Sequence, residues 1–169
     1  MIFCIIITTL SFLLDSYISM YIPISVTNNN ILVPMFTIIS LIIIYPYSNN
    51  NIKGYLTICL IFGLLYDITF TNTLGLNIAL FFSIGYLISS LDSVLSNNLL
   101  SLIIKMMLII IFYDVITYLI LLLLNYIDYS VLTLVIKIGK SILLNTIYLT
   151  SIYLITNLLS NKLNIKKSI

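Results

Sequence analysis

LLSLIIKMMLIIIFYDVITYLILLLLN, residues 99–125, is the longest and most apolar stretch of the chain. Its apolar residues follow one another without the strict alternation that a membrane β-strand needs. A hydrocarbon core about 30 Å thick takes roughly 20 residues of helix to cross, and a helix satisfies its own backbone hydrogen bonds in lipid. The stretch therefore predicts a transmembrane helix.

The rest of the chain has the same character. The sequence has 169 residues, of which 62% are hydrophobic and only 7% are charged, whereas an ordinary soluble domain carries about a quarter charged residues. This length allows about five to seven crossings with short connections. We therefore expect an all-α, polytopic integral membrane bundle in which residues 1–169 form a single transmembrane domain, with no soluble domain.

Polar and turn-forming residues divide the sequence into six expected helices. The first is expected to be retained in the protein, because no basic residue precedes Ile2 and no small-residue cleavage site follows the apolar run. Residues 129–140 are either an interfacial helix or the start of one long tilted helix whose lysines reach the membrane surface. The expected helices cover approximately residues 2–22, 31–47, 54–70, 74–91, 99–125 and 141–159, and residues 160–169 form a short basic tail.

The positions of the lysines predict the orientation, because cytoplasmic loops carry an excess of Lys and Arg. With six helices, five lysines fall on the side of the two termini and two on the other side. The first group is Lys53, Lys105, Lys162, Lys166 and Lys167, and the second is Lys137 and Lys140. We expect a multi-pass protein of the cell (inner, cytoplasmic) membrane with both termini in the cytoplasm. The second apolar run, residues 31–47, is the least certain to span the membrane. If it did not span, the two termini would lie on opposite sides of the membrane.

Composition excludes several functions. The net charge is only +2 and Arg is absent, so nothing resembles a surface for a nucleic-acid backbone. His and Glu are absent as well, and no nucleophile has a base beside it. Cys4 and Cys59 lie in apolar runs without metal-ligand spacing. We expect no catalysis, no metal and no cofactor. We expect the chain to contact the lipid bilayer and not to bind nucleic acid.

Asp15 and Asp114 are the clearest ionisable residues within predicted spans. Such a residue costs about 2.5–3.5 kcal/mol on insertion scales, so it normally faces the bundle interior and has a partner. Asp15 belongs to a stripe of polar residues spaced three and four apart, which places them on one face of a helix. Asp114 is nine residues after Lys105, about half a turn round the same helix, so these two cannot pair. Asp114 therefore needs a partner on another helix. The aspartates form either a proton or ion path, or hydrogen bonds between helices. The stripe consists of Cys4, Thr8, Ser11, Asp15 and Ser19.

The expected fourth helix carries small residues at every fourth position, Gly75, Ala79 and Ser83. This small-xxx-small pattern lets helix backbones approach closely in lipid. We expect a second helix to pack against it.

FGLLYDITFTNTLGLN, residues 62–77, joins the third and fourth expected helices. It resembles the rod shape-determining protein MreD family, whose chains of this size carry G-L-L-x-D followed by L-G-L-N or L-G-L-H between two helices. The rest of the chain agrees with that family in hydropathy and helix count. The residues that match the motif are Gly63, Asp67, Gly75, Leu76 and Asn77.

The same motif can be read physically. Asp67 lies at the end of one helix, close to the start of the next, where its carboxylate can accept hydrogen bonds from free backbone N–H groups. Asn77, in the first turn of that next helix, can join the network. The motif either closes a helical hairpin or also binds a partner.

The resemblance implies a noncatalytic membrane component of the bacterial elongation machinery, which maintains rod shape during peptidoglycan wall synthesis. It implies an MreC-like single-span protein, the MreB filament and wall synthases as partners. One rival is the substrate-binding membrane subunit of an energy-coupling vitamin transporter, which has similar length and six helices. Its first helix commonly has an Ala-rich docking pattern, which residues 1–14 lack. A membrane protein of unrelated role is a third reading.

Overall fold

The computed structural model describes residues 2–21, 33–48, 51–71, 75–125 and 130–163, and these residues form helices without any β-strand. The expected all-α bundle is confirmed. A 3-10 turn, η1 (Tyr45–Tyr47), continues α2, and a π-helical turn, η2 (Asp67–Thr71), continues α3. The α-helices are α1 (Ile2–Tyr21), α2 (Phe36–Ile44), α3 (Ile52–Tyr66), α4 (Leu76–Val94), α5 (Leu99–Leu123) and α6 (Val131–Lys162).

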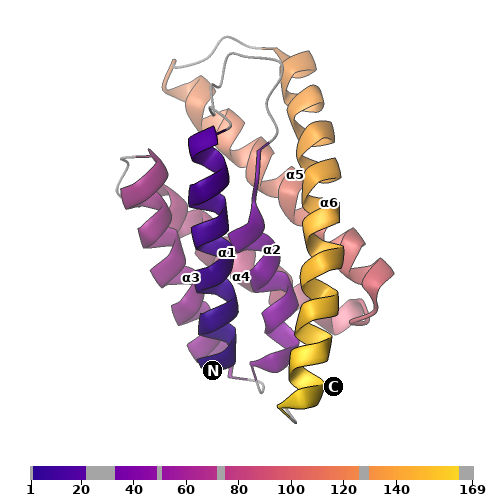
Figure 1. The fold of residues 1–169 in the computed structure, drawn as a ribbon. Helices are drawn as coiled ribbons and strands as arrows, with labels where there is room; N and C mark the ends of the chain where they lie inside the picture. The colour runs from indigo at the N-terminus through magenta and orange to yellow at the C-terminus, as the bar shows by residue number, and fades with distance from the viewer. Residues whose placement is uncertain (1, 22–32, 49–50, 72–74, 126–129, 164–169) are drawn as a thin grey trace.

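Five stretches of the described chain are long and apolar enough to cross a membrane, as expected for an integral membrane protein. They comprise α1, α3 with η2, α4, α5 and α6. The two chain ends lie at the same end of the bundle (Figure 1).

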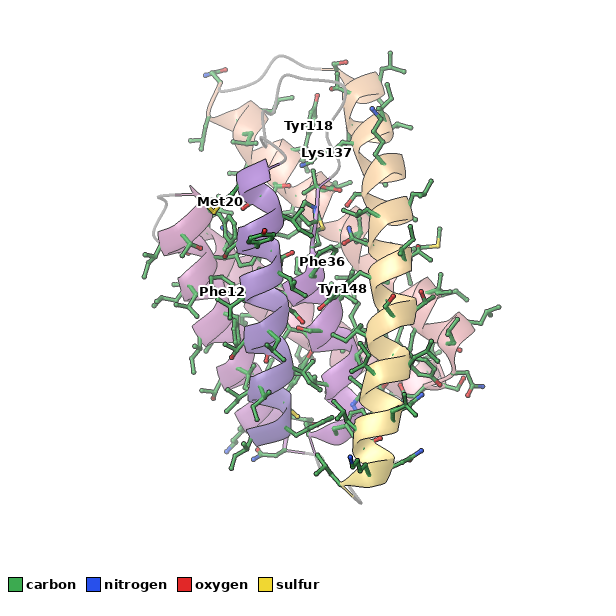
Figure 2. All side chains as sticks on the ribbon, in the orientation of Figure 1. Phe12, Met20, Phe36, Tyr118, Lys137 and Tyr148 are labelled. Carbon is green, nitrogen blue, oxygen red and sulfur yellow. The ribbon has the colours of Figure 1, made fainter. Side chains whose placement is uncertain are left out.

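The short helix α2 forms the centre of the bundle. It lies between α1 and α6, with α4 and α5 behind it (Figure 1), and contacts all four. Every side chain from Phe36 to Ile44 is buried. The Phe36 ring stacks on Tyr148 of α6, with ring centroids 3.9 Å apart (Figure 2).

The second expected helix, residues 31–47, differs from the structure. Residues 33–35 are not helical, and α2 has only nine residues, about 14 Å of helix, so it does not cross the membrane alone. Pro34 accounts for the late start, since it lacks an N–H and disfavours helical geometry in the residue before it. Residues 31 and 32 lie outside the described part.

The last expected helix, residues 141–159, is part of one continuous helix of 32 residues. At 1.5 Å per residue this is about 48 Å, longer than the hydrocarbon core. The alternative of a separate interfacial helix at residues 129–140 is therefore wrong, as far as residues 130–140 show. Residues 160–162 of the expected tail are helical, and residues 164–169 lie outside the described part.

The expected packing of a helix on Gly75, Ala79 and Ser83 is wrong within this chain. Gly75 and Ala79 are exposed, and a Cβ on Gly75 would meet nothing within 4 Å. Other glycines bring α3 and α4 together. A Cβ on Gly63 would lie 2.7 Å from the Asn77 carbonyl oxygen, and one on Gly85 would lie 2.7 Å from Cys59 Sγ.

Candidate functional site

Asp67 caps the N-terminus of α4 from the end of α3. Its Oδ2 accepts hydrogen bonds from the backbone N–H groups of Gly75 (2.9 Å) and Ile78 (3.3 Å), and its Oδ1 accepts from the N–H of Asn77 (2.9 Å). The first N–H groups of a helix have no partner within the helix, and they favour negative charge. The sequence predicted this arrangement, and the structure adds that Asp67 is fully buried.

Glycines at two positions make this cap possible. Gly75 precedes α4 with φ +108°, a left-handed conformation that favours glycine. Gly63 lies against the backbone of Asn77 and Ile78, where any side chain would collide. Leu76, the remaining matched residue, begins α4 with its side chain partly buried.

Asn77 extends the cap toward a third helix. Its Nδ2 donates to Asp67 Oδ1 (3.1 Å) and to Thr71 Oγ1 (3.2 Å), while its Oδ1 accepts from the Tyr113 hydroxyl of α5 (3.0 Å). Asn77 is fully buried, so this network lies inside the bundle. The motif therefore joins α3, α4 and α5.

Asp15 of α1 caps α2 in a similar way. Its Oδ1 accepts from the N–H of Phe36 (2.8 Å), and its Oδ2 accepts from both the N–H (2.8 Å) and the hydroxyl (2.6 Å) of Thr37. The Tyr66 hydroxyl donates to the same Oδ2 (2.7 Å). Four of the five side chains in the expected polar stripe are buried, so the stripe faces the interior.

Asn145 of α6 satisfies the backbone that precedes α2. Its Oδ1 accepts from the N–H of Met35 (3.0 Å), and its Nδ2 donates to the carbonyl of Val33 (3.1 Å). Ser141 donates to the same carbonyl (3.2 Å). Irregular backbone at membrane depth is tolerated only where protein surrounds it and satisfies its polar groups, and these contacts meet that condition.

Tyr66 and Asp67, adjacent at the start of η2, reach two different helix N-termini. Tyr66 bonds to Asp15, which caps α2, and Asp67 caps α4. π-Helical turns occur frequently at functional sites. This pair makes the end of α3 the junction between the two caps.

Asp114 has its partner on α6. Lys137 Nζ lies 2.9 Å from Asp114 Oδ1; the Asp114 side chain is 0% exposed and that of Lys137 is 38% exposed. Neither carboxylate oxygen has a further hydrogen-bond partner in the described part of the chain. The same two helices are also joined by Tyr118 of α5, whose hydroxyl accepts from the N–H of Ser130, the residue before α6 (2.6 Å).

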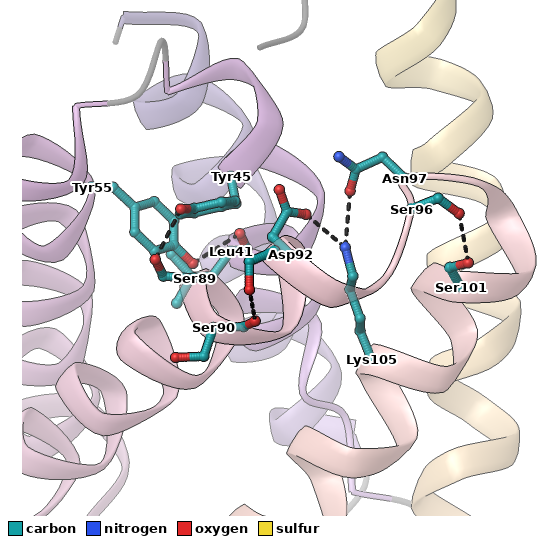
Figure 3. Close-up of polar contacts among 11 residues, drawn as sticks. Leu41, Tyr45, Tyr55, Ser89, Ser90, Asp92, Ser96, Asn97, Ser101 and Lys105 are labelled. Carbon is teal, nitrogen blue, oxygen red and sulfur yellow. Dashed lines mark hydrogen bonds and ion pairs between the residues drawn. The ribbon is translucent and has the colours of Figure 1, made fainter. Parts of the chain in front are cut away.

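A second ion pair joins α4 to α5. Lys105 is 1% exposed, and its Nζ lies 2.6 Å from Asp92 Oδ1 and 2.9 Å from Asn97 Oδ1 (Figure 3). Nearby, the hydroxyl of Tyr45 meets that of Ser89 (2.9 Å), and Tyr55 donates to the carbonyl of Leu41 (3.1 Å). The segment formed by α2 and η1 is thus hydrogen-bonded to α3 and to α4 near this ion pair.

Several of these residues were not predicted as members of a site. Asn145 and Thr37 are polar residues within otherwise apolar runs, which is an available signal, and Tyr113 directly precedes Asp114. Tyr66 immediately precedes the motif aspartate, and its role follows only from the position of α1. Among the described residues, no group of three or more Cys or Asp side chains is placed to hold a metal ion.

The arrangement is suited to fixing helix positions. Asp15 and Asp67 each accept at least four hydrogen bonds with good distances. Hydrogen bonds to a charged group contribute about 1.5–3 kcal/mol each. Both carboxylates are therefore held by the chain itself.

Comparison with protein-family models identifies the family of this chain. The model of the rod shape-determining protein MreD matches residues 1–163, which include all six α-helices and the whole α3–α4 motif. Searches of curated proteins and of solved structures found no match. The likeness seen at residues 62–77 thus extends over essentially the whole sequence, and the chain belongs to the MreD family of rod shape-determining proteins.

Proposed function

We propose that this chain acts without catalysis, as a membrane component of the bacterial elongation machinery that regulates cell shape and peptidoglycan wall synthesis through partner binding in the membrane. The observation that carries the proposal is the family match over residues 1–163. The hydrogen bonds of the buried motif and the apolar helices of the described chain support it physically.

The bonding of the motif supports a noncatalytic role. Asp67 is fully buried, and its two oxygens accept hydrogen bonds from Gly75, Asn77 and Ile78. A general base must instead reach the proton of a substrate, directly or through one water molecule. We propose that the five motif residues, Gly63, Asp67, Gly75, Leu76 and Asn77, hold the α3–α4 hairpin in the shape that partners bind.

The proposed partners are an MreC-like single-span protein, the MreB filament and wall synthases. The described chain consists almost entirely of helices suited to the membrane, so its influence on them passes through helix faces and short loops. We place the protein in the cytoplasmic membrane with both termini in the cytoplasm. The common position of the two termini agrees with this proposal (Figure 1).

The interior of the bundle weighs against a vitamin-binding transporter subunit. A ligand pocket typically has about 300–1,000 Å³ lined by apolar groups and a few polar ones. Here α2 occupies the centre with every side chain from Phe36 to Ile44 buried, and the Asp15 carboxylate occupies its N-terminus. In transporters with broken helices, such N-termini face the anionic group of a substrate.

Two experiments test the proposal. Deleting the gene is expected to change rod shape and the pattern of wall insertion, and unaltered shape and insertion under all growth conditions tested would contradict it. A mild-detergent pull-down of the tagged protein from its native membrane, with mass spectrometry, is expected to recover a single-span coiled-coil protein or a wall synthase. Recovery of paired ATPases with their membrane coupling subunit would instead identify a transporter.

A further inference from the structure

The end of α3 connects the cap on α2 with the cap on α4. The Tyr66 hydroxyl donates to Asp15 Oδ2 (2.7 Å), and Asp15 accepts from the N–H groups of Phe36 and Thr37 at the start of α2. The next residue, Asp67, accepts from the N–H groups at the start of α4. A single peptide bond therefore separates a donor to the first cap from the acceptor of the second.

Tyr66 and Asp67 cannot change position independently. The planar peptide between them holds their Cα atoms about 3.8 Å apart. The hydrogen bonds of both residues involve a carboxylate, and such bonds weaken steeply when their geometry is disturbed. A displacement of Asp67 that follows α4 therefore also displaces Tyr66 and its bond to Asp15.

Aromatic packing gives Tyr66 a second connection between the same elements. The centroid of its ring lies 4.6 Å from that of Phe70 in η2, 5.0 Å from that of Phe81 in α4 and 5.9 Å from that of Phe12 in α1. Tyr66 is buried, and side chains in a close-packed interior transmit displacement to one another. The direction of the Tyr66 hydroxyl therefore depends on the positions of both α1 and α4.

The π-helical turn η2 lets the end of α3 adjust. Its geometry is rare in helices and occurs frequently at functional sites. Ile68, Thr69 and Thr71 of this turn have exposed side chains. Segments with few buried side chains rearrange at a lower free-energy cost than the core. The end of α3 can therefore shift without separation of the helices around it.

We propose that Tyr66 is a positioning residue that couples the cap on α2 to the cap on α4 through the end of α3. A change at either cap then alters the other, because coupling between two sites is reciprocal. The helix α2 contacts α1, α4, α5 and α6 from the centre of the bundle (Figure 1), so a displacement of the α3–α4 hairpin reaches the rest of the molecule. Partner binding at this hairpin would use the same route, and that consequence alone rests on the proposed function.

Amide hydrogen exchange of the purified full-length protein in detergent micelles tests the coupling without a partner. Tyr66→Phe keeps the ring and removes only the hydroxyl, whose hydrogen bond goes to the α2 cap. The N–H groups of Asn77 and Ile78, which Asp67 holds at 2.9 and 3.3 Å, report on the α4 cap. The N–H of Leu149, in the buried face of α6, reports on opening of the bundle as a whole.

Tyr66→Phe is expected to accelerate exchange at Asn77 and Ile78 at least about fivefold more than at Leu149. Tyr45→Phe is the matched control, because it removes another hydroxyl that bonds to α4, at Ser89 (2.9 Å), away from both caps. It is expected to change the same ratio by less than about twofold. Equal acceleration at all three N–H groups with Tyr66→Phe would overturn the proposal, because the hydroxyl would then act only on overall stability.

A double-mutant cycle is the second measurement. Asp15→Asn and Asp67→Asn each weaken one cap, and their effects on the unfolding equilibrium constant in mild detergent are expected to be coupled at least about fivefold. In a Tyr66→Phe background the same two effects are expected to multiply to within about twofold. Independent effects with Tyr66 present, or equal coupling in both backgrounds, would show that Tyr66 does not connect the caps. That result would leave the proposed function standing, whereas unaltered rod shape after gene deletion would contradict the function and leave the coupling standing.

Discussion

At the scale of single residues, the motif aspartate differs from an ordinary helix cap. A usual cap precedes its helix, as Asn51 does by accepting from the N–H of Gly54 (3.0 Å) at an exposed position. Asp67 comes from the preceding helix and is buried. Its removal would leave several N–H groups without water to replace the lost partner.

We therefore expect Asp67→Ala to lower the free energy of unfolding by about 2–4 kcal/mol, since each buried donor left unpaired costs about 1–3 kcal/mol. Asn51→Ala is the control, with an expected loss of about 1 kcal/mol. Thermal unfolding in mild detergent measures both. If Asp67→Ala leaves stability, membrane insertion, protein level and partner recovery unchanged, Asp67 does not hold the hairpin.

Gly63 offers a second test at this scale. A Cβ there would lie 2.7 Å from the Asn77 carbonyl oxygen and 2.9 Å from Ile78 Cα, and both are backbone atoms that cannot simply rotate away. Gly63→Ala is expected to destabilise the protein by about 1–3 kcal/mol. Gly139→Ala in α6, where a Cβ meets nothing within 4 Å, is expected to be neutral or to stabilise by up to about 1 kcal/mol. Equal effects in the same unfolding measurement would contradict this account.

At the scale of helices, charged side chains of neighbouring elements pair inside the bundle. Lys105 of α5 pairs with Asp92 of α4, and Lys137 of α6 pairs with Asp114 of α5. Asp114 is the more sensitive partner, because no other described residue donates to it. Breaking a buried pair leaves an uncompensated charge, whereas replacing both partners removes the charge altogether.

For the Asp114–Lys137 pair, we predict that replacing both residues lowers the free energy of unfolding less than replacing Lys137 alone. Lys137→Met alone is expected to lower the free energy of unfolding by about 1–3 kcal/mol, less than for a fully buried pair because Lys137 is 38% exposed. Asp114→Leu combined with Lys137→Met is expected to recover most of that loss, because no charge then remains buried. A double-mutant cycle of detergent unfolding measures the difference. A double variant that is as unstable as the sum of its single variants would show that the two residues act independently.

At the scale of the whole molecule, the lysines predict how the protein is oriented in the membrane. Lys105 and Lys137 are neutralised by partners within the bundle. The four lysines at the helix ends and in the tail, all expected on the side of the termini, therefore carry most of the predicted asymmetry. The four are Lys53, Lys162, Lys166 and Lys167.

This asymmetry predicts the result of a labelling experiment. Leu124→Cys is placed just beyond α5, at the end of the bundle opposite the termini (Figure 1), and Lys162→Cys at the end of α6. A membrane-impermeant maleimide is expected to label the first in intact cells and the second only after permeabilisation. Background labelling is expected to be low because Cys4 and Cys59 are buried. The reverse pattern would place the termini outside.

The α3–α4 motif shows how far local sequence determines a site. Asp67, Gly75 and Asn77 are close in the chain, so a tight connection between two helices already brings a carboxylate to the free N–H groups of the next helix. The cap on α2 is different. Asp15 and Asn145 come from the first and last helices, and nothing in the local sequence specifies that they meet at Phe36 and Met35.

The sequence by itself determined that this protein is a helical membrane bundle, because apolar runs of this length have no alternative that satisfies the backbone in lipid. It also determined the Asp67 cap, through residues that are close along the chain. Only the tertiary structure decided that α2 is short and central, that the small residues of α4 face outward, and that Asp114 pairs with Lys137. The reason is physical: an apolar side chain suits lipid and protein interior equally well, so hydropathy places a helix in the membrane without assigning the neighbours of its faces.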